Sequence, residues 1–208
     1  MTKSGKRLTA CDTRPARASQ AGQCKIQCMS KRSNPLDRFA RDLPPGRLEW
    51  IGVRPERKAA LQVLERAEAV PGLGLEGDYR TEKKPGSSRQ VTVISREFIE
   101  QIAYFLAREE INPALLRRNL VVSGMNLNAL RYQRFRIGQV VLEARSLCHP
   151  CSRMESALGK GGVAAMIGHG GLCCKIIEGG WMSVGDAVEV VAPGQNLDLF
   201  AAGAQDPA

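Results

Sequence analysis

Two of the chain's seven cysteines, Cys148 and Cys151, lie three positions apart in the segment RSLCHPCSRM. Cysteines at this spacing serve as half of a structural zinc site, as a redox-active pair, or as one working thiolate beside an auxiliary thiol. The three alternatives predict three different kinds of protein, and other features of the sequence distinguish between them.

A structural zinc ion needs four ligands, usually supplied as two chelating pairs. The candidate ligands near Cys148 and Cys151 are His169, Cys173 and Cys174. Cys173 and Cys174 are adjacent in a segment that we predict to be a strand, so their side chains should point to opposite faces and one should face the core. A zinc-stabilised binding module without catalysis stays open as an alternative, but its ligand set is poor.

A thioredoxin-like redox pair would also place C-x-x-C between a strand and a helix. That arrangement puts the motif after the first strand and helix, whereas here it follows about two thirds of the chain and precedes a Gly-rich, strand-rich segment. We therefore favour the third alternative, a single thiolate that binds a transition metal or accepts sulfur, because thiolates are soft ligands.

A metal that arrives inside an anionic organic cofactor would also need basic and amide groups for the cofactor's phosphate. The sequence offers Arg89 before one predicted strand, Arg117 and Asn119 before another, and Arg153 just past Cys151. These residues are our expected cofactor-binding set, with Cys151 as the thiolate.

The net charge of +9 is concentrated at the start of the chain. Residues 1–48 hold 11 Lys or Arg and 3 Asp or Glu, while the remaining 160 residues hold 19 and 18. The ten aromatic residues are scattered, so neither a basic domain nor a base-stacking surface is indicated and we expect no nucleic-acid partner. No apolar run is long enough for a membrane helix, and an odd cysteine count without a signal core indicates reduced thiols and a cytoplasmic protein.

Three regions follow from composition and periodicity. Residues 1–47 show no sustained period and end near Pro44-Pro45-Gly46, so we predict a basic, flexible N-terminal extension. Residues 48–193 should form the domain, and residues 194–208 a loose tail.

The domain is predicted to be α+β and mainly β, barrel-like, with a few short helices. The predicted strands are 47–55, 89–95, 120–124, 139–147, 171–178 and 186–192. Ser95 and Asn112 are expected to cap helices that begin after them, and 152–158 and 162–168 should be helical turns. Residues 58–70 fit either a helix or a pair of strands.

The blocks RRNLVVSG, FRIGQVVLE, CHPCSRM and GHGGLCCKIIEGGWMSVGDAVEVV occur in this order. With them, residues 48–193 resemble a MOSC domain, the C-terminal module of molybdenum-cofactor sulfurases, which also occurs as a stand-alone protein. The resemblance implies a β-barrel-like fold that binds the molybdenum cofactor, a pterin dithiolene with a phosphate.

In the relatives of the amidoxime-reducing component, one cysteine binds molybdenum, and small N-hydroxylated substrates are reduced with electrons from a partner redox protein. The resemblance assigns that cysteine to Cys151, as metal ligand and catalytic residue, and makes Cys148 auxiliary. It also places Arg117 and Asn119 near the cofactor, and more weakly Arg89.

Two segments depart from the family pattern, and both concern the substrate specificity rather than the fold. Tyr79 and Arg80 stand where many members have Arg and then His, and Arg118 stands where the reductase relatives often have Pro. A second hypothesis is that Cys151 carries a persulfide, loaded by a cysteine desulfurase, and passes sulfur to a metal centre.

Overall fold

The computed structural model describes residues 37–57, 59–81 and 85–191. Most of the predicted extension and the whole predicted tail lie outside these residues. The last part of the predicted extension includes a helical turn, α1 (Asp37–Ala40), whose Ala40 is buried. Within the described residues, none of the helices has the length and apolar character needed to cross a bilayer.

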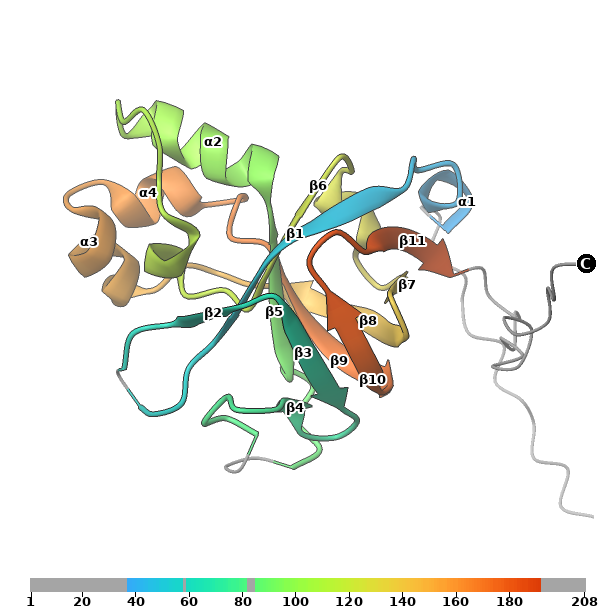
Figure 1. Cartoon of the computed structure of the whole chain (residues 1–208). Coiled ribbons are helices and arrows are strands. Elements are labelled where there is room, and N and C mark those ends of the chain that lie inside the picture. Colours follow the sequence, from blue (N-terminus) through green and yellow to red (C-terminus); the bar gives the residue numbers. More distant parts are fainter. Residues whose placement is uncertain (1–36, 58, 82–84, 192–208) are drawn as a thin grey trace, which may run out of the picture. The chain divides into compact units, whose positions relative to one another are not determined.

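Seven strands close into a mixed β-barrel (Figure 1). In order around the barrel they are β11 (Ala187–Val191), β7 (Arg134–Ile137), β8 (Val140–Leu147), β9 (Leu172–Glu178), β5 (Val91–Ser95), β6 (Leu120–Ser123) and β1 (Gly46–Val53). Pairing of Gly46 with Val188 joins the last strand to the first. β5 and β6 run parallel, and the other barrel neighbours are antiparallel. The predicted barrel is therefore confirmed.

Four further strands lie outside the seven-stranded barrel. β2 (Gln62–Leu64) pairs with β1, while β10 (Gly180–Ser183), β3 (Arg66–Val70) and β4 (Gly74–Leu75) form a small separate sheet. Residues 58–70 thus supply a pair of strands rather than a helix. The short strands β4 and β10 were not expected, because two to four residues beside glycines give no readable alternation.

The helices α2 (Arg96–Phe105), α3 (Ser152–Leu158) and α4 (Gly162–Met166) lie on one side of the barrel (Figure 1). The expected caps are present. Ser95 Oγ accepts a hydrogen bond from the Phe98 amide, and Asn112 Oδ1 accepts one from the Ala114 amide. The element after Asn112 is a 3₁₀ helix, η1 (Pro113–Leu116), and a second, η2 (Leu127–Leu130), follows β6.

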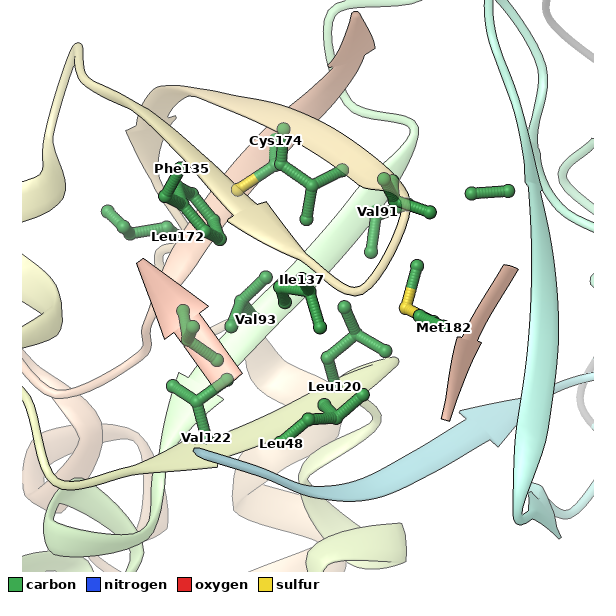
Figure 2. Packing of buried hydrophobic residues seen from close by; sticks show 14 of the residues in the cluster. Leu48, Val91, Val93, Leu120, Val122, Phe135, Ile137, Leu172, Cys174 and Met182 are labelled. Carbon is green, nitrogen blue, oxygen red and sulfur yellow. The ribbon is translucent and has the colours of Figure 1, made fainter. Parts of the chain in front are cut away.

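Side chains alternate between the inside and the outside of the barrel wall. Val91, Val93 and Cys174 point into the barrel and pack with the other core residues shown in Figure 2. Ile94 and Val121 point outward and belong to a second apolar cluster with α2, α3 and α4. By the same alternation, residues next to these inward ones in β5 and β9 face outward, toward the helical side.

Candidate functional site

A cavity of about 120 Å³ lies on this outer, helical side of the barrel. It is lined by Arg80, Arg89, Thr92, Arg117, Arg118, Cys148, His149, Cys151, Arg153 and Met154. We call it the arginine pocket. The lining comes from the starts of β5 and β6, the end of β8, the start of α3 and the loop after β4. Segments far apart in sequence therefore converge on one small volume.

Four of the five residues predicted for the site line this pocket: Cys151, Arg89, Arg117 and Arg153. The described residues around the pocket include five arginines and no carboxylate. Such a lining attracts anions, and guanidinium groups suit phosphate in particular. The roles of these four residues as cofactor ligands stay predictions.

Asn119, the fifth predicted residue, lies beneath the pocket rather than in its lining. Its Oδ1 accepts hydrogen bonds from the amide and hydroxyl of Thr92, and its Nδ2 donates to the carbonyl of Gly52 and to Asp78 Oδ2 at 3.0 Å. The side chain is 7% exposed. Asn119 thus holds β1, β5 and β6 to the loop after β4, and a direct contact with a ligand would require it to give up one of these bonds.

Asp78 is the other half of this buried network. Its carboxylate accepts hydrogen bonds from the amides of Arg80 and Arg54 in addition to the one from Asn119. These bonds fix the backbone that presents Arg80 to the pocket. No local pattern marks Asp78 as a site residue, because two of its three partners, Arg54 and Asn119, come from distant segments.

Arg118 is buried and holds the pocket together through backbone carbonyls. Its Nε donates to Gly170 O at 2.7 Å, its Nη1 to Leu116 O at 2.9 Å and its Nη2 to Cys148 O at 3.4 Å. The guanidinium therefore brings a positive charge next to Cys148 while it joins the start of β6 to the end of β8.

Arg117 has a left-handed backbone conformation, with φ of +58° at the end of η1. This conformation is unfavourable for a residue with a side chain and is found often at functional sites. Here it turns the chain sharply between η1 and β6 and puts two consecutive arginines, Arg117 and Arg118, into the lining of one pocket.

Cys148 is nearly buried, at 6% exposure, and follows directly after β8. A hydrogen bond from the Cys173 thiol lowers the pKa of Cys148 to about 6, against the effect of burial and with the help of Arg118, Arg89 and Arg80. The thiolate form is therefore favoured at neutral pH. Cys148, which the sequence analysis made auxiliary, is thus a thiol whose ionised form three arginines help to stabilise.

Cys151 is exposed and stands at the N-cap position of α3, where its side chain makes no capping hydrogen bond. Glu155 in α3 accepts hydrogen bonds from the amides of Gly161 and Val163, which ties α3 to α4. The thiol of Cys151 is consequently accessible from solvent while the segment that carries it is held in place.

Two glycines allow the chain to pass close behind Cys148. A Cβ at Gly170 would lie 2.0 Å from Cys148 O, and one at Gly171 would lie 2.1 Å from Val93 O. Gly171 also has φ of +82° and accepts a hydrogen bond from the Cys148 amide at 2.7 Å. The Gly-Gly pair before β9 is therefore needed for the packing of β5, β8 and β9 at the pocket.

The proposed zinc ligands are not assembled. Cys174 points into the barrel core, as one of the adjacent cysteines was expected to do, and is fully buried. The ring of His169 packs against the rings of Phe98 and Phe105. Within the described residues, no three His, Cys, Asp or Glu side chains are grouped as a metal ion would require.

Solved structures with the same fold include two proteins named YiiM and one named YuaD. The YuaD protein from Bacillus subtilis gives a TM-score of 0.63 at 21% identity, over 71% of this chain and 96% of its own. YiiM from Geobacillus stearothermophilus gives 0.58 at 14% identity, over 73% and 78% of the two chains, and YiiM from Escherichia coli gives 0.53 at 20%, over 70% and 69%. At these identities the likeness shows the fold alone.

A comparison with curated proteins found no match. The sequence pattern of the MOSC domain, in contrast, matches residues 80–189, more than half of the 208 residues. This match spans the strands and loops that build the arginine pocket and both of its cysteines. The chain belongs to the MOSC domain family.

Proposed function

We propose that this protein binds the molybdenum cofactor in the arginine pocket and reduces small N-hydroxylated or related substrates. The observation that carries the proposal is the combination, in one pocket, of an exposed thiol at Cys151 with five arginines and, among the described lining residues, no carboxylate. To bind the cofactor, a protein has to supply a thiolate ligand for the metal and groups that bind the phosphate.

The excess of positive charge fits an anionic ligand. Arg54 is 3% exposed and its Nε has no hydrogen-bond partner in the protein, and burial together with the charge of Arg117 lowers the pKa of its guanidinium. Positive groups repel one another in the free protein, and an anion that binds between them relieves this repulsion and stabilises the protein. Arg54 lies outside the pocket lining, and the five arginines of the lining are the donor set that fits a phosphate.

The size of the cavity limits what can be enclosed. About 120 Å³ accommodates a phosphate-sized group but is well below the roughly 300 Å³ at which pockets for larger organic ligands begin. The remainder of a pterin cofactor would be bound at the opening of the pocket. Arg80, Arg89 and Arg153 are exposed there and can reach it.

Six residues in and beneath the pocket have defined parts in this proposal. Cys151 would ligate molybdenum, while Arg89, Arg117 and Arg153 would hold the phosphate. Arg118 would keep the end of β8 in register, and Asn119 would support the pocket from below. When bound, the cofactor supplies the two-electron chemistry that removes an oxygen atom from the substrate. The electrons are expected from a partner redox protein.

The test starts with full-length protein made in a host that synthesises the molybdenum cofactor and, for comparison, in an isogenic host that does not. The proposal expects close to one molybdenum per chain from the first host only, by elemental analysis, and reduction of an amidoxime to the amidine with a reduced viologen dye. The proposal would be contradicted if protein from the competent host contained no molybdenum, or if it contained zinc instead of molybdenum.

The alternative of a sulfur carrier draws on the same exposed Cys151. Incubation with a cysteine desulfurase and free cysteine, followed by mass spectrometry of the intact protein, measures it directly. A persulfide on Cys151, in protein that takes up no molybdenum, would favour this second function over the first.

A further inference from the structure

Two further cysteines, Cys148 and Cys173, lie near each other at the base of the arginine pocket. Cys148 continues the antiparallel ladder of β8 and β9, because its amide donates to the carbonyl of Gly171. Cys173 in β9 pairs with Ser146 in β8, and Cys148 is two residues beyond Ser146, so Cys148 and Cys173 lie on the same face of the two strands. The two thiols act on each other, because each is the largest influence on the pKa of the other.

We propose that Cys148 and Cys173 form a reversible disulfide when the protein meets a hydroperoxide, so that the base of the pocket is a redox modification site. The bond would connect the end of β8 to β9 and would replace a negative thiolate by a neutral disulfide among the arginines. Neither effect requires a cofactor to be bound, so this inference stands apart from the proposed function.

Cys148 has the properties of the thiol that reacts first. It lines a cavity that is large enough for hydrogen peroxide, and Arg118, Arg89 and Arg80 supply positive charge around its thiol. The lowered pKa supports this order, because the thiolate is the nucleophilic form of cysteine. Arginines also stabilise the negative oxygen that leaves from a peroxide.

The chemical steps balance with a hydroperoxide as the oxidant. The Cys148 thiolate attacks one peroxide oxygen, so that an S–O bond forms and the O–O bond breaks, and the departing oxygen takes a proton from water. The Cys173 sulfur then attacks the resulting sulfenic acid. An S–S bond forms, the S–O bond breaks, and the hydroxyl leaves as water with the Cys173 proton. Two thiols lose two electrons and the peroxide gains them.

Oxidation of Cys148 also makes Cys173 a better partner. The hydrogen bond to Cys148 is the largest cause that raises the pKa of Cys173, followed by burial and by the charge of Cys148. A neutral sulfenic acid removes the negative charge, while Arg89 and the hydrogen bond with Ser146 still favour the Cys173 thiolate. Formation of the sulfenic acid at Cys148 therefore makes the attack by Cys173 more favourable.

Peptide mapping of the full-length protein tests the proposal. The protein is treated with hydrogen peroxide, alkylated, and digested with trypsin, which separates peptide 146–153, with Cys148 and Cys151, from peptide 161–175, with Cys173 and Cys174. The expected product is a cross-link between these two peptides that dithiothreitol reverses. Fragmentation should find Cys151 and Cys174 alkylated.

Single variants decide which thiols are joined. Cys173→Ser should abolish the cross-link and leave a sulfenic acid on Cys148 that dimedone captures, and Cys148→Ser should abolish both products. Cys151→Ser is the matched control and should leave the cross-link unchanged. Circular dichroism of each variant checks folding, and the Cys148→Ser result decides the question if Cys173→Ser does not fold. A cross-link through Cys151 would overturn the proposal. So would the absence of a cross-link at a peroxide dose that oxidises Cys148 to sulfinic or sulfonic acid.

Discussion

Asn119 donates a hydrogen bond of 3.0 Å to the buried carboxylate of Asp78, and this bond ties the start of β6 to the loop that carries Arg80. The pair explains why Arg80 and Arg117, which are separated by 36 intervening residues, line one pocket. It also makes Asp78 a residue that acts on the pocket without lining it.

Replacement of Asp78 by Ala should therefore lower both stability and anion binding. The amide of Arg54 and one Nδ2 hydrogen of Asn119 lose their acceptor in a buried place, which costs about 1–3 kcal/mol per group left unsatisfied, and the part-buried amide of Arg80 loses its acceptor as well. Urea unfolding measures the loss. Glu76→Ala, at an exposed position of the same loop, is the control and should stay within about 0.5 kcal/mol of the wild type. Equal effects of the two substitutions would show that the network has no special role.

Inorganic phosphate should stabilise the protein through the arginine pocket. A ligand at 100 times its Kd adds about 2.7 kcal/mol of stability, which raises the melting temperature by several degrees. Arg117→Ala or Arg89→Ala should weaken phosphate binding by about 10-fold or more, because each removes a charge-assisted hydrogen bond.

The control for this series is Arg131→Ala, an exposed arginine outside the pocket lining. It should leave the phosphate-dependent rise in melting temperature intact, measured at constant ionic strength. A rise that Arg131→Ala reduces as much as Arg117→Ala does would indicate screening of the total charge rather than a binding site.

Gly168 and Gly171 form a matched pair that separates backbone strain from steric conflict. Both have φ of +82°, but a Cβ at Gly168 meets nothing within 4 Å, whereas one at Gly171 lies 2.1 Å from Val93 O. Gly168→Ala should lower the free energy of unfolding by about 1–2 kcal/mol, because a residue with a side chain is strained in the left-handed conformation. Gly171→Ala should cost clearly more, because β9 must move away from β5.

Urea unfolding of both variants at matched ionic strength gives the comparison. A shift in the midpoint without a change in slope identifies a stability effect. Similar losses for the two substitutions would mean that the strands adapt to the extra carbon, and that the close approach at Gly171 is not needed for the pocket.

Local signals in the sequence predicted the elements better than they predicted the site. The caps at Ser95 and Asn112 are confirmed, because each depends on residues within one helical turn. The opposite directions of Cys173 and Cys174 are confirmed because alternation along a strand needs no knowledge of the neighbours.

What the sequence left open depends on strand register. Arg80 and Arg118 could be noted only as departures from a family pattern. The place of Arg118 beside Cys148 follows from the pairing of β5 with β6 and of β8 with β9, and that of Arg80 from the hydrogen bond between Asn119 and Asp78. The hydrogen bond between Cys148 and Cys173 depends on the same register. A signal that could have been used is the Gly-Gly pair before β9, which indicates that another segment passes close by.

The ionisation of Cys148 can be measured by thiolate absorbance near 240 nm, as the difference between wild type and Cys148→Ser. Because the pKa is lowered to about 6, the thiolate should be present above about pH 6 and lost as the pH falls below it. Cys173→Ala removes the hydrogen bond that contributes most, so the midpoint should rise toward the ordinary value of about 8.5. A midpoint that stays unchanged in Cys173→Ala would assign the shift to the arginines alone.

The choice between the two pocket cysteines as metal ligand is tested by Cys151→Ala and Cys148→Ala in protein from a cofactor-competent host. Cys151→Ala should lose its molybdenum and should lower amidoxime reduction by about 1000-fold or more, since the ligand and the metal act as one unit. Cys148→Ala should retain most of both, because Cys148 is a buried free thiol that interacts with Cys173, whereas Cys151 is exposed. Molybdenum content per folded chain, by elemental analysis with circular dichroism, is the primary readout. The reverse result, with molybdenum kept by Cys151→Ala and lost by Cys148→Ala, would transfer the ligand role to the thiolate at the base of the pocket.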